Sequence, residues 1–311
     1  MNIVFLDRKS LGKDLDLERF EDFGSVTMYD FSTVEEARER VKDADIIITN
    51  KVPMNENSLK EAEHLKLICV TATGINNLDL DYLDAHNIAW RNVAGYSTET
   101  VAQHTFALMF YLLEHLHYYD AYVKEERYVN DKIFTHFDLP FHELSGKTWG
   151  IIGLGAIGKR VADLASAFGA KVVYYSTSGK NHDLDYEEVD LDTLLATSDI
   201  VSVHAPLTEN TTNLMDAAAF RKMKKSALFI NVGRGAIVNE ADLADALEQE
   251  EIAGAGLDVL CEEPMVEANP LRRIKDSNRL IITPHIAWAS IEARTRLMDI
   301  IYHQVEEFLQ R

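Results

Sequence analysis

The first hundred residues alternate short apolar runs with stretches whose apolar positions have helical spacing. The runs that we predict as strands are Ile3–Leu6, Ser25–Tyr29, Asp45–Thr49, Leu67–Ala72 and Ile88–Asn92. The helical stretches between them are Leu15–Phe23, Val34–Lys42, Ser58–His64 and Leu78–His86. Ser32 and Glu35 form a predicted capping box for the second of these helices. Because strands that alternate with helices build a parallel sheet covered on both faces, the pattern predicts an α/β fold.

The same alternation returns after residue 146. The strands predicted there are Lys147–Ile152, Lys171–Tyr175, Ile200–His204, Ala227–Val232, Gly254–Val259 and Leu280–Thr283. We predict a helix at Glu240–Gln249, capped by Asn239 and with Asp242 in its first turn. A last helix, Ile291–Leu309, follows a sheet that is already complete, so it can return to the first domain.

Two segments join the halves. We predict one long helix at Thr98–Lys124, which contains no proline or glycine, and a loop at Arg127–Leu144. The aromatic and leucine side chains on several faces of this helix are Phe106, Phe110, Tyr111, Leu113, Tyr118 and Tyr122. A helix that is apolar around most of its circumference is normally buried. We therefore predict a homodimer formed through this part of the chain, with a central helix between two domains of one chain as the alternative.

Composition narrows the class of protein. A chain of 311 residues exceeds what one hydrophobic core usually accommodates, so we expect two domains. The formal net charge of −20 argues against nucleic acid or an anionic membrane as a partner. The two cysteines, Cys69 and Cys261, suggest neither a disulfide framework nor a metal site, and we expect Cys69 in the core. The chain begins on a strand rather than a signal peptide and lacks an apolar stretch of about 18 residues, so we expect a soluble cytoplasmic protein.

A glycine-rich turn stands between the predicted strand Lys147–Ile152 and a helical stretch that starts at Ala156. The pattern Gly153-x-Gly155-x-x-Gly158 is typical of dinucleotide-binding folds when a strand precedes it and a helix follows. Gly153 permits the tight turn, Gly155 lets backbone amides approach a pyrophosphate, and Gly158 lets the helix pack on the strand. The helix N-terminus also attracts the anion. The cofactor contacts that we predict here are Gly153, Gly155, Ala156, Ile157 and Gly158.

Further short segments follow one another along the chain in a specific order. They are Thr71–Asn77, Asn92–Ser97, Gly146–Thr148, His204–Leu207, Asn231–Gly235, Gly256–Val259, Glu263–Pro264 and Thr283–Ala287. With the glycine turn, they resemble the D-isomer-specific 2-hydroxyacid dehydrogenase family over essentially the whole chain. The run His285–Ser290, followed by Glu292–Arg294, is similar to the C-terminal signature of its glycerate dehydrogenase (hydroxypyruvate reductase) branch.

The resemblance implies a fold and an activity. The fold has two doubly wound parallel-sheet domains. A Rossmann NAD(P)-binding domain at residues 98–287 is inserted into a flavodoxin-like substrate domain made of residues 1–97 and 288–311. The implied activity is hydride transfer between NAD(P)H and a small 2-keto acid, as in the conversion of hydroxypyruvate or glyoxylate to D-glycerate or glycolate.

Three side chains are predicted to carry this chemistry. Arg234 follows an apolar strand and lies between two glycines, and its guanidinium can bind a carboxylate through two parallel hydrogen bonds. His285 follows Pro284 at the end of the last strand, and an imidazole is the natural acid–base group at neutral pH. The family pattern implies that Glu263 accepts a hydrogen bond from His285 and keeps the ring protonated. The other histidines singled out, which we expect on helix faces or in loops, are His104, His115, His117 and His136.

The resemblance also implies binding residues. The substrate would meet Trp288 and the backbone N–H groups around Thr73 and Gly74. Asp258 would either contact the nicotinamide or hold the neighbouring loop. The other implied cofactor contacts are His204, Pro206, Thr211, Val232 and Gly233.

The cofactor preference depends on Ser176. About 18 positions after Gly158 an NAD-binding fold normally carries an acidic residue that binds the ribose hydroxyls, and this chain has Ser176 there. The three hydroxyls of Ser176, Thr177 and Ser178, together with Lys180, could bind a 2′-phosphate, although the arginine usual in NADP-preferring sites is missing. We therefore favour NADP slightly over NAD.

Two alternatives to a keto-acid reductase stay open. Phosphite dehydrogenases share the family fold, whereas formate dehydrogenases carry glutamine where this chain has Glu263. Some relatives are nucleotide-sensing corepressors, but the chain has no basic patch or disordered tail typical of that role.

Overall fold

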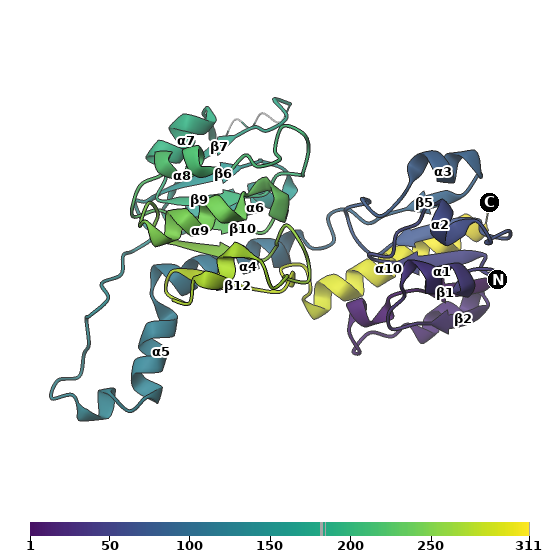
Figure 1. Cartoon of the computed structure of the whole chain (residues 1–311), viewed down its shortest axis with the longest axis horizontal. Helices are drawn as coiled ribbons and strands as arrows, with labels where there is room; N and C mark the ends of the chain where they lie inside the picture. Colours follow the sequence, from purple (N-terminus) through teal and green to yellow (C-terminus); the bar gives the residue numbers. More distant parts are fainter. Residues whose placement is uncertain (181–182, 184, 311) are drawn as a thin grey trace. The chain divides into compact units, whose positions relative to one another are not determined.

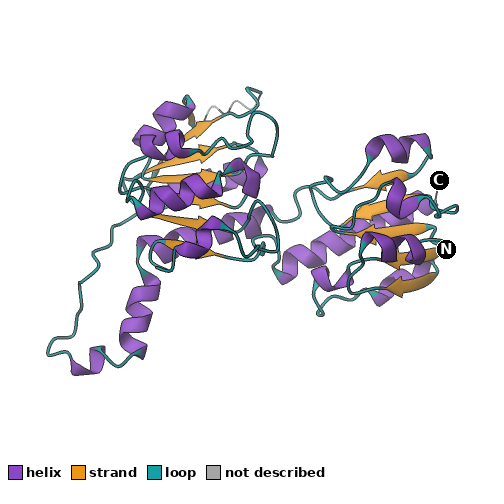
Figure 2. Cartoon of the chain, in the orientation of Figure 1, coloured by secondary structure: helices purple, strands orange, loops and turns teal. Residues whose placement is uncertain are grey.

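The computed structural model of the chain describes residues 1–180, 183 and 185–310. Its contacts divide the chain into two compact units, one formed by residues 1–97 with the segment from Ala289 onward, and the other by Thr98–Trp288. Each unit is a parallel sheet with helices on both faces (Figures 1 and 2). Each unit therefore has the layered α/β architecture predicted from the alternating pattern.

The first unit is built on a five-stranded parallel sheet with the strand order β2-β1-β3-β4-β5. Its strands are β1 (Asn2–Phe5), β2 (Ser25–Met28), β3 (Ile46–Thr49), β4 (Leu67–Val70) and β5 (Ala89–Arg91). This order is the flavodoxin-like one. Every residue of β3 and β4 is buried, including Cys69, because central parallel strands are covered on both faces.

The helices of the first unit include the last one in the chain. They are α1 (Val34–Arg40), α2 (Glu56–Leu59), α3 (Leu80–Ala85) and α10 (Ile291–Leu309). The buried face of α10 carries Leu297, Ile301 and Val305 at intervals of four residues. Its Arg294 guanidinium pairs with the Asp14 carboxylate at 2.5 Å. The C-terminal helix therefore completes the first unit, against which it lies in yellow in Figure 1.

The second unit is built on a seven-stranded parallel sheet with the order β12-β11-β10-β9-β6-β7-β8. Its strands are β6 (Thr148–Ile152), β7 (Lys171–Tyr175), β8 (Glu187–Glu188), β9 (Ile200–Val203), β10 (Leu228–Asn231), β11 (Gly254–Leu257) and β12 (Leu280–Ile282). Counted from β6, this is the Rossmann order with one strand added at an edge. The order reverses between β6 and β9, and ligands bind at such a switch point.

The helices of the second unit cover both faces of this sheet (Figure 2). They are α4 (Thr98–Leu113), α6 (Ala156–Ala167), α7 (Leu191–Thr197), α8 (Ala217–Lys222) and α9 (Glu240–Glu248), with α5 (Leu116–Lys124) beside them in sequence. Asn239 caps α9 as predicted, because its side-chain oxygen accepts the N–H groups of Ala241 and Asp242. The pattern did not single out the short helices α7 and α8 or the two-residue strand β8.

The prediction of one continuous helix at residues 98–124 was wrong. The helix ends at Leu113, and His115 takes a left-handed backbone conformation with φ of +51° before α5 begins. Residues on α4 such as Phe106 and Met109 are buried in the unit, whereas every residue of α5 is at least partly exposed. A single left-handed residue leaves no trace in helix propensity, so the break was not visible in the sequence.

Smaller corrections concern helix starts in the first unit. The capping box at α1 is formed by Thr33 and Glu36, one residue later than predicted. The hydroxyl of Ser32 instead donates to the carbonyl of Leu6 at 2.6 Å. The helix predicted at 15–23 is a 3₁₀ helix over Glu18–Phe23, and the one predicted at 58–64 is the short helix α2, which Asn55 caps.

Candidate active site

The glycine turn lies between β6 and α6, at the carboxyl edge of the second sheet. Gly153 has φ of +93°, a conformation that favours glycine. A Cβ on Gly158 would lie 2.2 Å from the carbonyl oxygen of Gly153, so only glycine lets α6 lie this close to the turn. A Cβ on Gly155 would have open space around it. The backbone N–H groups at the start of α6, from Ala156 onward, can therefore receive a phosphate group.

His285 and Glu263 form the predicted pair. The imidazole Nδ1 lies 2.7 Å from Oε2 of Glu263, and the other carboxylate oxygen accepts the N–H of Leu260 at 2.9 Å. The side chains of His285 and Glu263 are 28% and 31% exposed, so a ligand can reach the ring. Because Nδ1 faces Glu263, Nε2 is the nitrogen that remains for a substrate.

The backbone of His285 is held from β11. His285 has φ of +55°, which is uncommon for a residue other than glycine. Its N–H donates to the carbonyl of Asp258 at 2.9 Å. The carboxylate of Asp258 accepts the N–H groups of Ile286 at 2.9 Å and Ala287 at 2.7 Å. The structure thus shows the loop-holding role for Asp258, one of the two roles considered from the sequence.

Arg234 sits in a turn that Asn231 closes. The amide of Asn231 donates to the carbonyl of Arg234 at 3.0 Å, and its oxygen accepts the N–H of Gly233 at 3.0 Å. A Cβ on Gly235 would lie 1.9 Å from the carbonyl carbon of Leu260, so this turn lies directly against the loop that leads to Glu263. Asn231 belongs to the sequence motif Asn231–Gly235, and the motif alone did not indicate this role.

The three predicted catalytic residues therefore follow three neighbouring strands. Arg234 follows β10, Glu263 follows β11 and His285 follows β12, and these strands are adjacent in the parallel sheet. The carboxyl ends of parallel strands meet at one edge, where doubly wound folds bind ligands. A cation, a carboxylate and an imidazole are brought to the same edge as the glycine turn.

Two buried polar atoms lie at predicted cofactor positions. The hydroxyl of Ser176, just beyond β7, has no hydrogen-bond partner among the described residues, and the residue is 9% exposed. Nδ1 of His204, just beyond β9, likewise finds no partner in the described part of the chain. Burial lowers the pKa of His204 to about 3, so its ring is neutral at pH 7. Its Nε2 lies 2.9 Å from the hydroxyl of Ser202.

The other predicted cofactor residues lie at or near this edge. The hydroxyl of Thr211 is held by the carbonyl of Pro206 at 2.8 Å, which fixes the loop after β9. Val232 is buried directly after β10. Thr177 is half-buried and Lys180 is exposed, both in the segment after β7.

The predicted substrate residues belong to both units. Trp288 packs against the core of the second unit, three residues after His285. Thr73 and Gly74 lie in the first unit, in the loop after β4. The amide of Asn92 donates to the carbonyl of Thr73, and the Thr73 hydroxyl donates to the carbonyl of Val93. This loop is thereby tied to the segment that follows β5.

His104 lies on α4, as expected for a helix-face residue, but its ring also contacts residues that follow two strands. Its Nε2 lies 2.9 Å from the hydroxyl of Thr283 and 3.5 Å from the carboxylate of Asp258. The ring of His136 also has partners, because it stacks on Tyr122 at 3.7 Å between ring centroids. Both contacts join residues from different elements, and the sequence contains no local signal for them.

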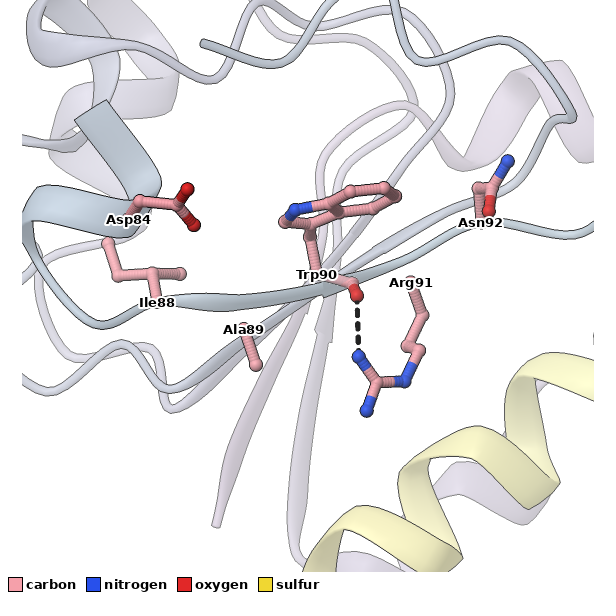
Figure 3. Close-up of a pocket in the computed structure, with 6 residues that line it drawn as sticks. All are labelled: Asp84, Ile88, Ala89, Trp90, Arg91 and Asn92. Carbon is pink, nitrogen blue, oxygen red and sulfur yellow. Dashed lines mark hydrogen bonds between the residues drawn. The ribbon is translucent and has the colours of Figure 1, made fainter. Parts of the chain in front are cut away.

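A pocket of about 460 Å³ lies in the first unit, whereas the glycine turn belongs to the second unit. Figure 3 shows Asp84, from α3, and Trp90, from the edge strand β5. The guanidinium of Arg91 donates to the carbonyl of Trp90 at 2.8 Å. The predicted site residues are not among the six that line it. The strand ends of the second sheet, and not this pocket, therefore remain the candidate active site.

Comparison with known proteins decides the family. Residues 106–287 match the model of the D-isomer specific 2-hydroxyacid dehydrogenase NAD binding domain. The chain belongs to this family. It is 40% identical to a glycerate dehydrogenase of Methylorubrum extorquens over 99% of this chain and 96% of that one. It is 38% identical to a hydroxypyruvate reductase of Blautia hydrogenotrophica over 100% of this chain and 97% of that one.

A solved structure extends the comparison. An acyclic imino acid reductase in complex with NADPH and D-Arg superposes with a TM-score of 0.86 at 29% identity, covering 100% of this chain and 97% of that one. The protein is therefore an NAD(P)-dependent oxidoreductase of the D-2-hydroxyacid dehydrogenase type, acting on a CH–OH group. The two alternatives drawn from the sequence, a phosphite dehydrogenase and a corepressor, are not favoured.

Two further findings concern other kinds of site. Within the described part of the chain, no helix combines the length and apolar character that a membrane span requires. The described residues also contain no group of three or more His, Cys, Asp or Glu side chains placed to hold a metal ion.

Proposed function

We propose that this dehydrogenase reduces small 2-keto acids of the hydroxypyruvate and glyoxylate type to D-2-hydroxy acids. Arg234 binds the substrate carboxylate and polarises the keto group. His285 donates a proton to the keto oxygen, and Glu263 stabilises the imidazolium form before the transfer. The proposal is supported by the names of the two relatives above and by the placement of these three residues at one sheet edge.

The geometry of the His285–Glu263 pair indicates which imidazole nitrogen donates the proton. When bound, the reduced nicotinamide supplies a hydride to the keto carbon. The keto oxygen then takes the proton from Nε2 of His285, because Nδ1 is committed to Glu263 at 2.7 Å. In the reverse direction the neutral ring accepts the hydroxyl proton at the same atom. This 2.7 Å contact is the single observation on which the proposed mechanism depends most.

The first unit supplies further contacts in this proposal. The N–H groups of Thr73 and Gly74 take part in no hydrogen bond with the described residues, although the loop itself is tied down through its carbonyl and hydroxyl groups. Free N–H groups on a fixed loop can bind a carboxylate. We propose that these N–H groups are contacts for the substrate carboxylate, and that Trp288 packs against the substrate.

The test is a turnover assay with the Arg234→Ala variant. Oxidation of NADH and of NADPH is followed with hydroxypyruvate, glyoxylate and pyruvate, and the configuration of the two chiral products, from hydroxypyruvate and pyruvate, is determined. Loss of one charge-assisted contact of roughly 3–5 kcal/mol lowers kcat/KM by about two to four orders of magnitude. Arg234→Lys keeps the charge but not the paired hydrogen bonds, so its kcat/KM should lie between those of the wild type and Arg234→Ala. Near-normal turnover by Arg234→Ala, or no turnover of any of these keto acids by the wild type, would contradict the proposal.

We further propose that the enzyme accepts NADPH at least as well as NADH. Ser176 stands where an acidic residue would repel a 2′-phosphate, and its buried hydroxyl is available to a ligand. Thr177 and Lys180, in the segment that follows, add a second hydroxyl and a positive charge.

We also propose that the protein forms a homodimer. The arm, defined here as residues 116–144, extends from the sheet of the second unit (Figure 1). Its apolar side chains that are more than half exposed are Val123, Val129, Ile133, Phe134, Phe137 and Phe141. Monomeric proteins rarely expose so many large apolar groups together. A second copy of the chain, with its own arm, is the partner that we propose for this surface.

A further inference from the structure

A chain of hydrogen bonds runs from α4 to the loop that carries His285. Nε2 of His104 lies 2.9 Å from the hydroxyl oxygen of Thr283. That hydroxyl lies 2.5 Å from Oδ1 of Asp258. His104 is far from both partners in sequence. These hydrogen bonds therefore link helix α4 to the ends of β11 and β12.

The direction of each hydrogen bond follows from the donors available. A carboxylate only accepts, so the single proton of Thr283 goes to Asp258. The Thr283 oxygen must then accept, and His104 must donate its Nε2 proton. Burial lowers the pKa of His104 below its usual value, although the Asp258 carboxylate opposes this shift. The ring is therefore a neutral donor at pH 7.

The hydrogen-bond chain ends on a carboxylate that is almost fully buried. The Asp258 side chain is 1% exposed, and the His104 side chain is 20% exposed. Besides Thr283, the carboxylate accepts the N–H groups of Ile286 and Ala287. A buried carboxylate keeps a fixed orientation only when its oxygens are well occupied by donors. The donor from Thr283 is thus one of three that orient Asp258.

Asp258 in turn fixes the backbone around His285. It holds the two residues after His285 through its side chain and the N–H of His285 through its carbonyl. Between these contacts His285 keeps its left-handed φ of +55°. Such a conformation persists only when the surrounding structure enforces it. The direction in which the imidazole points, toward Glu263 at 2.7 Å, depends on this backbone.

We propose that His104 and Thr283 are positioning residues for His285. His104 orients the Thr283 hydroxyl, Thr283 orients the Asp258 carboxylate, and Asp258 holds the His285 loop so that the imidazole meets Glu263. The expected loss of catalytic rate rests on the proposed role of His285 as the proton donor. The expected loosening of the His285 loop does not depend on that role.

The test compares variants that keep or remove each donor. Gln places a side-chain N–H near the position of Nε2, so His104→Gln retains the hydrogen bond and His104→Leu removes it. Thr283→Ser and Thr283→Val form the second such pair. His64→Leu, at an exposed position of the first unit, is the matched control. Cofactor affinity and thermal unfolding are measured for every variant to establish that it is folded.

Two readouts are expected to change together. In His104→Leu and Thr283→Val, kcat/KM for hydroxypyruvate falls roughly 10- to 100-fold, because a small misplacement of a reacting group has an effect of this size. The basic limb of their pH–rate profile also shifts to lower pH, since the imidazole is no longer held on Glu263. Amide hydrogen exchange over residues 285–288 becomes at least roughly tenfold faster. His104→Gln, Thr283→Ser and the control stay close to wild type.

Each failure has a distinct meaning. A His104→Leu variant with wild-type exchange over residues 285–288 would overturn the proposal. So would a His104→Gln variant as impaired as His104→Leu, since packing rather than the hydrogen bond would then be responsible. If exchange rises as expected but no keto acid is turned over by the wild type, the positioning role stands and the proposed function fails.

Discussion

At the scale of single residues, the proposed chemistry depends on which partner each polar atom has. His285 was identified from its position after a strand, and its partner Glu263 from the family pattern. Asp258 and Asn231 were found in motifs, but their hydrogen bonds to the loops of His285 and Arg234 became visible only in the structure. His104 could not be identified, because its contact with Thr283 joins residues 179 positions apart.

The pairing of Glu263 with His285 predicts a pH effect. The carboxylate favours the protonated ring, and reduction requires that proton. In Glu263→Gln a neutral amide replaces the carboxylate, so the imidazolium that donates the proton loses the opposite charge that lies 2.7 Å from Nδ1. We expect the basic limb of the kcat/KM profile for keto-acid reduction to move to lower pH, with cofactor affinity unchanged. The neighbouring exposed residue offers a control, Glu262→Gln, whose profile should match the wild type. A Glu263→Gln profile that does not move would show that the pair has no catalytic role.

Ser176 predicts the cofactor preference. In Ser176→Asp the new carboxylate can accept hydrogen bonds from the ribose hydroxyls and repels a 2′-phosphate. Two like charges at close range in a partly desolvated site cost roughly 1–4 kcal/mol. We therefore expect the affinity for NADPH to fall at least roughly tenfold while the affinity for NADH is kept. Ser226→Asp, at an exposed position of the second unit just before β10, is the control. A wild type that strongly prefers NADH would argue against position 176 as the ribose contact.

At the scale of elements, most strands and the major helices were predictable, because buried parallel strands are continuous apolar runs and capped helices carry local signals. The four-residue strands β3 and β4 are buried throughout. The predictions were wrong where the conformation or capping contact of a single residue sets the end of a helix. This was so at the left-handed His115 and at the N-cap residue Thr33. The short elements α7, α8 and β8 were not predicted, since they contain too few residues to show a period.

The turn between β6 and α6 gives an element-scale prediction. In Gly158→Ala the Cβ meets the Gly153 carbonyl oxygen, so α6 must move away from the turn. In Gly155→Ala the new Cβ meets no protein atom, but it occupies the space where we expect the pyrophosphate. Both variants should bind NADH and NADPH at least roughly tenfold more weakly, equivalent to about 1.4 kcal/mol. Only Gly158→Ala should also unfold at a clearly lower temperature. Calorimetry and cofactor titration measure both effects. Unchanged cofactor affinity in Gly155→Ala would contradict a phosphate site at this turn.

At the scale of the whole molecule, the two-domain organisation was expected from length and from the repeated alternation of strands and helices. The order of strands could not be obtained from the pattern, because periodicity says nothing about which strands are neighbours. That order brings Arg234, Glu263 and His285 to one edge of the second sheet. The family resemblance supplied the same grouping by analogy, and the sheet order gives its physical cause.

The arm predicts the oligomeric state. Its Phe134 and Phe137 are 88% and 75% exposed, and α5 exposes at least part of every residue. Contacts within the arm, such as the Tyr119 hydroxyl on the carbonyl of Leu139, fold it back on itself but leave these rings in solvent. An ordered segment with an apolar outer surface is stable in water only when another surface covers it. A second copy of the chain offers a surface of the same kind.

Light scattering should therefore give a mass near twice the 35.2 kDa of one chain at micromolar concentration. Replacing both phenylalanines, as Phe134→Asp with Phe137→Asp, places charges in the proposed interface and should shift the mass toward that of one chain. Phe31 is 67% exposed in the first unit, so Phe31→Asp is a matched control that should leave the mass unchanged. A wild-type mass of one chain would refute the dimer. A dimer that persists in the double variant would place its interface outside the arm, because two buried carboxylates without partners cannot be accommodated at a packed apolar contact.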